Sequence, residues 1–302
     1  MRLLRNVLPY PEKDPVERRI VLLGKTGAGK SAAGNTILRK KHKFRSQFSL
    51  SSVTAQCEME EAVVAGRRVC VVDTPGLFDT YMSPEDLAVE IGRSVYLSSP
   101  GPHAFLYVQP INIRFTQQEE EVFDKLEQIF GEEMRKYTII LFTHGDQLKG
   151  ESVENLIREN ESLSRLVDQC GGYHVFNNKD PRKKKQVTDI LEKIDRMVER
   201  NGGSCYSNEM FVDAANSSFE DMNNNLPNKG NEPKPGTFWD KWGKHLLTGA
   251  ALLCVAAVGA GAFLVYGAAV AGGSAAAAAS AAGAGAAAGA GAAAGAAAGA
   301  AM

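Results

Sequence analysis

The sequence predicts a three-layer α/β fold with a mostly parallel central sheet, followed by a C-terminal hydrophobic segment. Short apolar runs with β-branched residues alternate with segments whose apolar residues recur at helical spacing. This alternation is typical of parallel strands joined by helices. A glycine-rich octet stands between the first apolar run and the first helical segment. No charged residue occurs in 246–302, so the end of the chain is predicted to meet a less polar environment than the domain before it.

The elements are expected in a regular order. Strands are predicted at 18–24, 63–73, 104–108, 137–143 and 173–176, the second as a hairpin that turns near Ala65 and Gly66. Helices are predicted at 30–39, 84–97, 116–130, 151–169 and 183–200. Ser83 is predicted to cap the second helix, and Thr116 with Glu119 to form a capping box at the third. The alternation stops after Asn201, and 223–236, rich in Asn, Pro, Gly and Lys, is interpreted as a linker.

The charge balance and the cysteines limit the classes of function. The chain carries 34 Lys and Arg against 35 Asp and Glu, a net charge of −1, which gives no support to nucleic acid as the main partner. Five cysteines, without a CxxC or a Cys/His pair at metal-ligand spacing, favour reduced thiols in a cytosolic compartment over a disulfide framework or a zinc site. Residues 1–11 lack the apolar core of a signal peptide.

The glycine-rich octet at 24–31, GKTGAGKS, matches the phosphate-binding pattern GxxxxGK[ST]. Its glycines let several backbone N–H groups face one phosphate, and the following helix points its positive end at the same place. Lys30 is expected to reach the β- and γ-phosphates and Ser31 to ligate Mg²⁺, whereas an ordinary glycine-rich turn is the alternative. The predicted phosphate-binding residues are Gly24, Lys25, Thr26, Gly27, Ala28, Gly29, Lys30, Ser31 and Ala32.

A second element, Asp73-Thr74-Pro75-Gly76, follows another predicted strand. A carboxylate at the carboxyl end of that strand stands where a water ligand of Mg²⁺ is needed, so Asp73 is predicted to act on the metal through water. The N–H of Gly76 can sense the γ-phosphate, which makes the loop after it a candidate switch. Leu77 stands where many small GTPases carry a water-orienting glutamine, so slow intrinsic hydrolysis is expected. A simple type I turn is the alternative.

A third element, Thr143-His144-Gly145-Asp146, ends a further strand and is similar to the guanine-reading NKxD motif with its first two positions changed. The ionised carboxylate of Asp146 only accepts hydrogen bonds, and guanine offers N1–H and N2–H₂ side by side. Asp146 therefore favours GTP and GDP over ATP, with a helix cap or turn as the alternative. Asn177 and Asn178 are predicted to hydrogen-bond the base from its other side, or else to form a turn. The three elements together predict a P-loop NTPase G domain.

These motifs, in this order, resemble those of the GTPases of the immunity-associated protein family, the AIG-type or GIMAP GTPases, which are septin-like members of the TRAFAC class. VLLGKTGAGKSAAGNTIL is similar to the family's phosphate loop and first helix, SSVTAQC to its switch I, and VVDTPGLFDT to its third motif. LSSPGPHAFLYV is similar to a box peculiar to the family, and FTHGDQL with FNN completes the set. The resemblance covers about residues 16–200.

The resemblance implies a G domain that dimerises across its nucleotide face and works as a scaffold or switch, often anchored to a membrane. It implies that Thr54 senses Mg²⁺ and that Lys30, Thr54 and Gly76 carry the catalytic roles. Thr143 and His144 are included in the nucleotide site because THGD resembles the THxx form of the related chloroplast import GTPases. A solvent-facing loop is the alternative for His144. His103, which begins a core strand, is expected to be structural.

The C-terminal stretch 246–271 is uncharged and long enough for a helix that spans a bilayer. Trp239 and Trp242, with Lys241 and Lys244, are interpreted as an interfacial belt before it. A tail anchor or membrane hairpin is the first interpretation. The alternatives are a helix buried against the G domain and a surface-lying or unstructured tail. The basic run at 182–185 is interpreted as a solvated face or as a contact with anionic lipid.

The expected organisation and function follow from these features. The expected parts are an N-terminal extension (1–15), an AIG-type G domain (16–200), a linker and juxtamembrane segment (201–245), a candidate membrane helix (246–272) and a Gly/Ala tail (273–302). The predicted function is a regulatory GTPase that binds GTP or GDP with Mg²⁺, hydrolyses slowly and dimerises with GTP at the cytosolic face of an intracellular membrane. A GTP-binding assembly scaffold with negligible hydrolysis is the alternative, and a soluble ATPase is a third interpretation.

Overall fold

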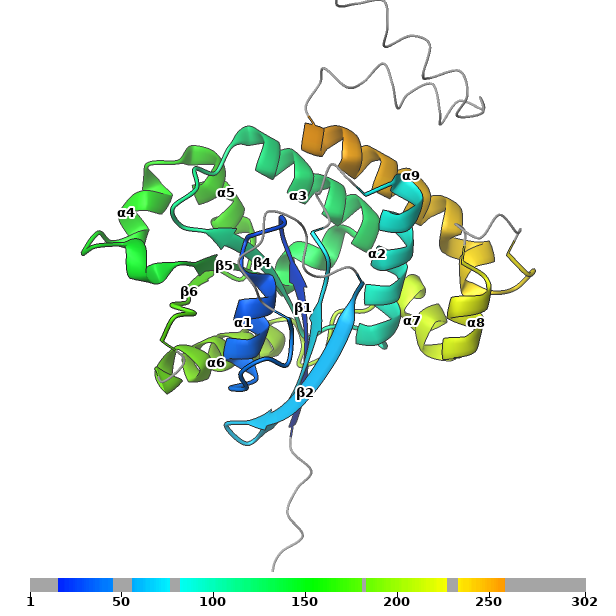
Figure 1. Ribbon diagram of the computed structural model, residues 1–302, viewed down its shortest axis with the longest axis horizontal. Coiled ribbons are helices and arrows are strands. Elements are labelled where there is room, and N and C mark those ends of the chain that lie inside the picture. The colour runs from blue at the N-terminus through cyan, green and yellow to red at the C-terminus, as the bar shows by residue number, and fades with distance from the viewer. Residues whose placement is uncertain (1–15, 46–55, 77–81, 181–182, 227–232, 259–302) are drawn as a thin grey trace, which may run out of the picture. The chain divides into compact units, whose positions relative to one another are not determined.

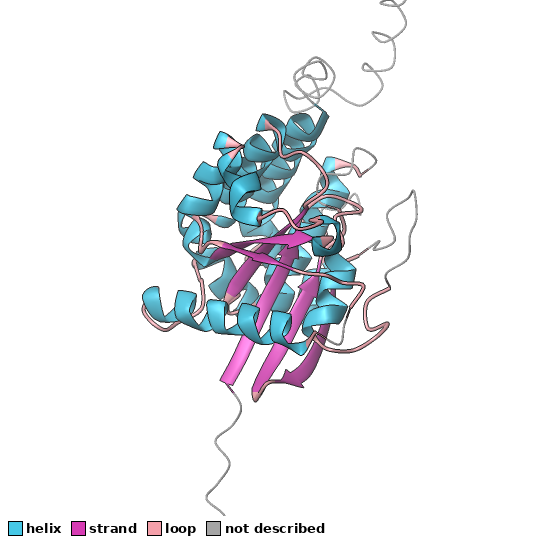
Figure 2. Ribbon diagram, turned by 90° about the vertical axis from the view of Figure 1, so that its left-hand side faces the viewer, coloured by secondary structure: helices cyan, strands magenta, loops and turns pink. Residues whose placement is uncertain are grey.

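The computed structural model describes residues 16–45, 56–76, 82–180, 183–226 and 233–258. In these ranges six strands form one sheet with helices on both faces (Figures 1 and 2). The strands are β1 (Val16–Leu23), β2 (Glu58–Val64), β3 (Arg67–Asp73), β4 (Ala104–Pro110), β5 (Thr138–Thr143) and β6 (Tyr173–Val175). The helices are α1 (Lys30–Ile37), α2 (Pro84–Ser98), α3 (Gln117–Phe130), α4 (Val153–Arg158), α5 (Glu161–Gln169), α6 (Lys184–Arg200), α7 (Glu209–Asn216), α8 (Phe219–Asn224) and α9 (Phe238–Val258), with 3-10 turns η1 (Glu132–Tyr137) and η2 (Gly145–Gln147).

The sheet has the order β2-β3-β1-β4-β5-β6, and within the described ranges every pairing except that of β2 with β3 is parallel. Successive residues of a strand face opposite sides of a sheet, so each strand serves two cores. Leu22 packs into the core beneath α1 and α6, and Leu23 into the core beneath α2 and α3. The predicted fold class, three layers around a mostly parallel sheet, is confirmed.

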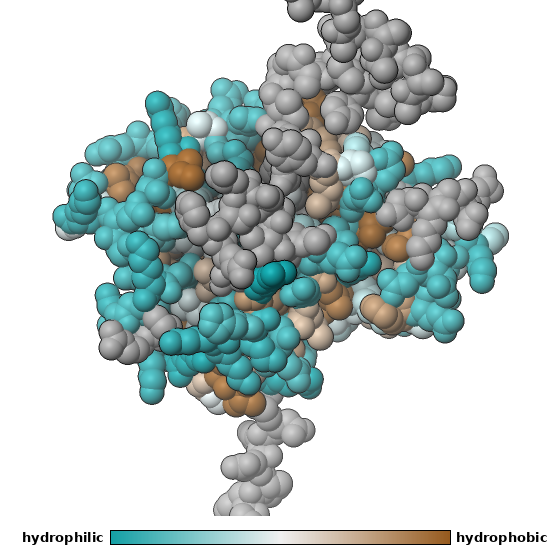
Figure 3. All heavy atoms as spheres, viewed as in Figure 1, coloured by the Kyte–Doolittle hydropathy of each residue, from teal (hydrophilic) through white to brown (hydrophobic). Residues whose placement is uncertain are grey.

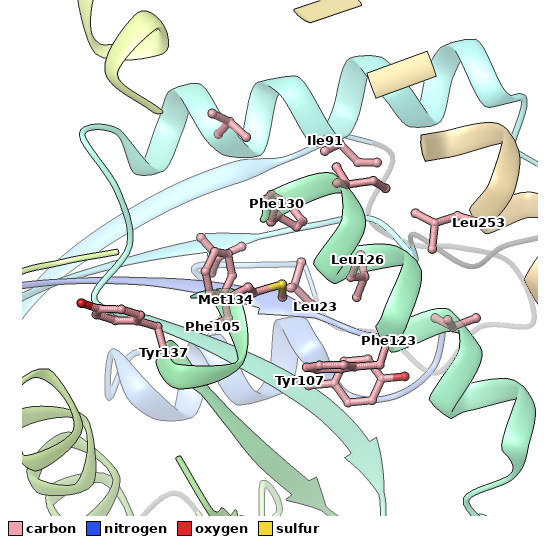
Figure 4. Packing of buried hydrophobic residues seen from close by; sticks show 14 of the residues in the cluster. Leu23, Ile91, Phe105, Tyr107, Phe123, Leu126, Phe130, Met134, Tyr137 and Leu253 are labelled. Carbon is pink, nitrogen blue, oxygen red and sulfur yellow. The ribbon is translucent and has the colours of Figure 1, made fainter. Parts of the chain in front are cut away.

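The core beneath α2 and α3 is rich in aromatic side chains (Figure 4). Phe105 of β4 packs on Phe130 of α3 with 5.3 Å between ring centroids, and Tyr107 packs edge-on against Phe123 at the same separation. Leu253 of α9 belongs to the same cluster. The third layer is therefore built by α2 and α3 together with α9, the last helix of the described residues.

The parallel pairing of β1 places the candidate site. β1 lies between β3 and β4, and the register sets Leu22 opposite Asp73 and Leu23 opposite Tyr107. Because the strands are parallel, the loops that follow β1, β3 and β5 leave the sheet along one edge. The three motifs that the sequence predicts to act together follow these strands, at 24–31, 73–76 and 143–146.

Most local signals in the sequence predict the local structure correctly. The hairpin between β2 and β3 turns at Ala65 and Gly66, both with positive φ (48° and 74°), as in the tight turns that suit paired strands. Ser83 caps α2 by accepting a hydrogen bond from the N–H of Asp86 at 3.1 Å. The capping box of Thr116 and Glu119 is present at α3.

The segment 151–169 forms two helices, where the sequence predicts one. The first ends at Arg158, and Asn160 caps the second. Its Oδ1 accepts a hydrogen bond from the N–H of Leu163 at 3.0 Å, and its Nδ2 donates to the carbonyl oxygen of Phe115 at 2.8 Å. A side chain that bonds to backbone in this way favours a helix end over a helix interior. The break is therefore local and does not change the order of the layers.

The chain after Asn201 also differs from the expectation that regular structure stops there. Within the described residues three helices follow, and the last of these, α9, packs on α2 and α3 (Figure 1). Leu246, Ala250 and Leu253, one helical turn apart along α9, are fully buried. For residues 246–258, the helix buried against the domain is thus the alternative that holds. Residues 259–272, the remainder of the candidate membrane helix, lie outside the described residues.

No helix in the described part of the chain combines the length and apolarity that crossing a bilayer requires.

The interpretation of Trp239 as part of an interfacial belt is wrong. The side chain is buried, its Nε1–H donates to the carbonyl oxygen of Met222 at 2.7 Å, and the ring packs against Gly92 of α2. Trp242 donates to Asp213 Oδ2 at 2.7 Å. The ring of Trp239 can lie against α2 because residue 92 is a glycine. A Cβ at that position would lie 3.1 Å from Trp239 Cζ2. The sequence contains this glycine but does not indicate that α9 packs against it. The absence of a side chain at Gly92 lets α2 and α9 approach closely.

Asp195 of α6 connects that helix to two strands. Its carboxylate accepts hydrogen bonds from Arg18 Nε at 2.7 Å and from Arg67 Nη2 at 2.5 Å, and all three side chains are about one fifth exposed or less.

Asp195→Asn keeps the shape of the side chain but removes its charge, so we expect the free energy of unfolding to fall by about 1–2 kcal/mol. Urea denaturation of the full chain measures it. Asp168→Asn, at an exposed carboxylate without an ion pair among the described residues, should change stability by less than about 0.5 kcal/mol.

Candidate nucleotide-binding site

The phosphate loop joins the end of β1 to the start of α1. Gly27 and Gly29 have φ of 78° and 92°, in the left-handed region that favours glycine. A Cβ on Gly24 would lie 2.6 Å from the carbonyl oxygen of Val108 on the neighbouring strand β4. The sequence GKTGAGKS thus folds into a tight loop because its glycines supply the conformations and the close approach that other residues cannot.

Lys30, the first residue of α1, holds its ammonium inside this loop. Its Nζ donates hydrogen bonds to the carbonyl oxygens of Gly24 and Lys25, each at 2.9 Å, and the residue is buried. Thr26, Ala28 and Ala32 lie in the same loop and first turn. A buried ammonium surrounded by backbone at a helix N-terminus is an arrangement suited to a polyphosphate.

Ser31 and Asp73 lie side by side. Ser31 Oγ donates a hydrogen bond to Asp73 Oδ2 at 2.6 Å, although 42 residues separate the two in the chain. Asp73 is the last residue of β3 and is buried. A hydroxyl and a carboxylate oxygen are ligands that Mg²⁺ prefers, so the pair fits the metal that the sequence predicts there.

The loop after Asp73 returns to the phosphate loop. Thr74 Oγ1 donates to the carbonyl oxygen of Leu22 at 2.7 Å. A Cβ on Gly76 would lie 2.8 Å from the backbone nitrogen of Thr26. The backbone of Gly76 is therefore next to the phosphate loop, as the switch prediction requires. Thr54 and Leu77 lie outside the described residues.

The wall on the base side is formed by the end of β5. Thr143 Oγ1 donates to the carbonyl oxygen of Ala28 at 2.8 Å, and His144 Nδ1 lies 3.0 Å from the same hydroxyl. Gly145 N–H donates to the carbonyl oxygen of Phe176 at 3.0 Å, which joins the loop after β5 to the loop after β6. His144, with φ of 60°, thus contacts a residue that itself contacts the phosphate loop.

Asp146 presents an exposed carboxylate at this wall. Lys179 Nζ donates to its Oδ2 at 2.7 Å, and this hydrogen bond lowers the pKa of the Asp146 carboxyl. The group therefore keeps its ionised, acceptor-only form well to the acid side of neutrality. Such a carboxylate suits a partner with two adjacent N–H groups, as guanine has.

The two asparagines after β6 have different environments. Asn178 Oδ1 accepts a hydrogen bond from Thr36 Oγ1 of α1 at 3.0 Å, and Asn178 Nδ2 would lie 3.6 Å from a Cβ on Gly29. Asn177 Oδ1 accepts from the N–H of Lys179 at 3.0 Å, which is a local turn. The structure brings Asn178 to the phosphate loop and gives Asn177 the turn that was the alternative.

Sequence reasoning missed two residues that hold predicted members of the site. Lys179 pairs with Asp146, and Glu119 Oε1, at the start of α3, lies 2.7 Å from Nζ of the predicted Lys25. The sequence signal that could have found them is the predicted parallel order of the strands, because it brings the loops after neighbouring strands together.

His103 is structural as expected. Its Nδ1 accepts from the N–H of Arg19 at 3.0 Å, and burial, with Arg19 nearby, lowers its pKa to about 3.

Comparison with known proteins identifies relatives. The sequence profile of the AIG1 family matches residues 18–225, through the end of α8. The human GTPase IMAP family member 8 is 39% identical over 72% of this chain and 33% of its own length. The Arabidopsis thaliana immune-associated nucleotide-binding protein 8 is 40% identical over 65% of this chain and 58% of its own. The matched part is thus about a third to somewhat over half of these relatives' length.

A further relative and a solved structure are also similar to this chain. The Arabidopsis thaliana immune-associated nucleotide-binding protein 1 is 34% identical over 63% of this chain, and the match covers 88% of that relative. Toc33 from Arabidopsis thaliana, solved with GDP and Mg²⁺, has a TM-score of only 0.37 at 20% identity, over 78% of this chain and 84% of Toc33. Because the family profile matches well over half of the sequence and includes all three motifs, the chain belongs to the AIG1 family.

Proposed function

We propose that this chain binds a guanine nucleotide with Mg²⁺ and acts as a regulatory GTPase with slow intrinsic hydrolysis. One observation carries the proposal: Thr143 joins the two halves of the site. It lies three residues before Asp146 and donates a hydrogen bond to Ala28 of the phosphate loop. A polyphosphate held by Lys30 therefore extends toward the carboxylate that selects the base. The names of the relatives, a GTPase and nucleotide-binding proteins, agree with it.

Each phosphate-side residue has a role that follows from its chemistry. Lys30 stabilises negative charge on the β- and γ-phosphate oxygens, and the N–H of Gly76 responds to the γ-phosphate. Ser31 would hold Mg²⁺ directly and Asp73 through water, while the bound metal neutralises charge on the same oxygens. Thr54, outside the described residues, is proposed as a further magnesium-sensing group.

The base-side residues select guanine. Asp146 accepts hydrogen bonds from N1–H and N2–H₂ of the base, and an adenine would place an acceptor opposite an acceptor. His144 and Asn178 contribute to the base side from the loops after β5 and β6, and Asn177 supports this side through its turn. The proposal for the base therefore depends on Asp146 more than on any other side chain.

The regulatory part of the proposal concerns assembly. We propose that GTP orders the loops around Thr54 and Gly76, that the ordered state dimerises across the nucleotide face, and that hydrolysis reverses it. Leu77, where many GTPases carry a glutamine, supports slow hydrolysis. The same residue favours a second candidate, a GTP-binding assembly scaffold with negligible hydrolysis.

Hydrophobic anchoring at the cytosolic face of a membrane belongs to the proposal only through residues outside those described. Residues 259–272 are uncharged, whereas the apolar face of α9 is already buried against α2 and α3. A tether would therefore use the chain beyond Val258. Flotation of the full chain with neutral vesicles, compared with a chain that ends at 258, measures its contribution.

Calorimetric titration of the full chain with GDP, GTP and ATP, with and without Mg²⁺, tests the binding proposal. We expect micromolar or tighter binding of both guanine nucleotides, and affinity for ATP at least about a hundredfold lower because Asp146 opposes adenine. Equal affinity for ATP would support the soluble ATPase, and no binding of any nucleotide would contradict the site as a whole.

Single-turnover hydrolysis measured over a range of protein concentrations separates the two functional candidates. A rate that rises with concentration indicates dimer-assisted catalysis by a slow GTPase. No phosphate release at any concentration, with nucleotide binding intact, leaves the assembly scaffold.

A further inference from the structure

Two basic segments that are distant in the sequence form one surface, here called the basic patch. The first, RKKHKFR at 39–45, follows α1 and contains no acidic residue. The second, at 183–185, begins α6. The members of the patch are Arg39, Lys40, Lys41, Lys43, Arg45, Lys183, Lys184 and Lys185, all exposed.

A contact between the two segments fixes their position. Arg39 Nη2 donates hydrogen bonds to the carbonyl oxygen of Lys184 at 3.2 Å and to Thr188 Oγ1 at 3.4 Å, although 145 residues separate Arg39 from Lys184. Helices α1 and α6 share one face of the sheet and one hydrophobic core. Figure 1 shows them side by side, and Figure 3 shows a hydrophilic surface over them.

The positive charge of the patch is largely uncompensated. Lys43 Nζ pairs with Glu60 at 2.6 Å. The other seven members form no ion pair with any described residue. The whole chain has a net charge of −1. The cluster is therefore a local concentration of positive charge and does not reflect a basic composition of the chain.

The position of the lysines is unfavourable for the helix that carries them. Lys184 and Lys185 occupy the first turn of α6, which has no acidic residue, and Lys183 provides no side-chain cap. Positive charges there oppose the helix macrodipole, and like charges on adjacent segments repel. Stability of the fold therefore does not account for the cluster, which indicates a function outside the domain.

We propose that the basic patch docks on the anionic leaflet of a lipid bilayer. Six of its eight cations are lysines, whose compact ammonium groups suit diffuse anionic headgroups, whereas the planar arginine fork suits defined bidentate contacts. Phe44, the phenyl side chain within 39–45, is fully buried, so it is not available to stack on bases. These features favour a lipid surface over RNA.

The patch is separate from both the nucleotide site and helix α9. None of the contacts described for the phosphate loop or the base wall involves a side chain of the patch. The two sites are separate even though Lys30 begins α1 and the patch follows the end of the same helix. Helix α9 packs on α2 and α3, which cover the other face of the sheet. The inference therefore goes beyond the proposed function and does not depend on nucleotide binding.

Co-sedimentation of the full chain with vesicles tests the proposal. The readout is the ratio of the partition coefficient for vesicles with about 30% phosphatidylserine to that for neutral phosphatidylcholine vesicles. This ratio isolates the electrostatic contribution from any insertion of the C-terminal segment. We expect a ratio of at least about ten at low salt that falls toward one as salt is raised.

The variant K40Q/K41Q/K184Q/K185Q removes four charges and keeps Arg39, which joins α1 to α6. We expect its ratio to fall at least about tenfold or to one. The control K136Q/R158Q/R200Q/K244Q removes four exposed cations elsewhere and should keep the wild-type ratio. Nucleotide affinity, measured on the same samples, reports whether the site is intact and should not change.

Three results would overturn the proposal. They are a wild-type ratio of one, equal losses in the patch variant and the control, and tighter binding to single-stranded RNA than to the anionic vesicles at equal phosphate concentration. If the fourfold variant fails to fold, K184Q/K185Q serves in its place with an expected loss of about threefold or more. Free inorganic phosphate at matched concentration should not compete, since the proposed partner is a charged surface.

Discussion

Asp146→Asn should exchange guanine for xanthine as the preferred base. The carboxylate accepts from both N1–H and N2–H₂ of guanine, whereas an asparagine amide offers one acceptor and one donor. Xanthine has a carbonyl oxygen where guanine has its amino group, so it accepts from the new amide while its N1–H still donates. We expect affinity for GDP to fall about a hundredfold or more and affinity for xanthosine diphosphate to rise by a similar factor.

The reciprocal gain makes this prediction sharper than a loss of binding, because a misfolded protein gains no new base. Competition between the two diphosphates, measured calorimetrically on the full chain, gives both affinities. Lys179→Ala is the matched control, since it removes the exposed partner of Asp146 but leaves the carboxylate in place. Its effect should stay within about threefold. A loss of GDP affinity in Asp146→Asn without any gain for the xanthine nucleotide would contradict the proposed contact with the base.

The layers and the outline of the site could be predicted because they depend on local signals and one topological rule. Short apolar runs ending at Gly24, Asp73 and Thr143 predicted strands, and parallel strands necessarily bring their carboxyl ends to one edge. The contacts Ser31–Asp73 and Thr143–Ala28 join motifs that the sequence predicted separately. Their side chains were identified by chemistry, and the fold then brought them together.

Contacts that depend on tertiary geometry could not be predicted in the same way. An uncharged stretch of Ala, Leu and Gly is compatible with a bilayer and with a groove between two helices, and composition does not distinguish them. Gly92 on α2 decides between them, because only a glycine there leaves room for the ring of Trp239. It lies 147 positions before Trp239, and nothing in the sequence around it indicates this contact. The same holds for the basic patch. The basic run at 182–185 was visible in the sequence, but the proximity of 183–185 to 39–45 depends on the tertiary contact of Arg39.

Trp239→Ala should strongly destabilise the packing of α9. The indole is 2% exposed, lies against Gly92 and donates from Nε1 to the carbonyl oxygen of Met222. Truncation leaves a cavity the size of the indole and an unpaired carbonyl, so we expect a loss of about 3–5 kcal/mol. Urea denaturation followed by circular dichroism measures the global loss, and hydrogen exchange of the α9 amides measures any separate undocking of the helix.

Two variants on the same helix separate burial from the hydrogen bond. Trp239→Phe keeps most of the apolar volume and removes the Nε1–H donor, so a loss of about 1–2 kcal/mol is expected. Leu252→Ala removes a side chain that is 40% exposed and should cost less than about 1 kcal/mol. If instead the tryptophan belonged to a membrane interface, Trp239→Ala would leave both denaturation and α9 exchange unchanged in aqueous solution, while weakening binding to neutral vesicles. The two interpretations of this residue therefore predict a large loss or no change in both measurements, because a buried indole stabilises the domain and an interfacial one stabilises only the bound state.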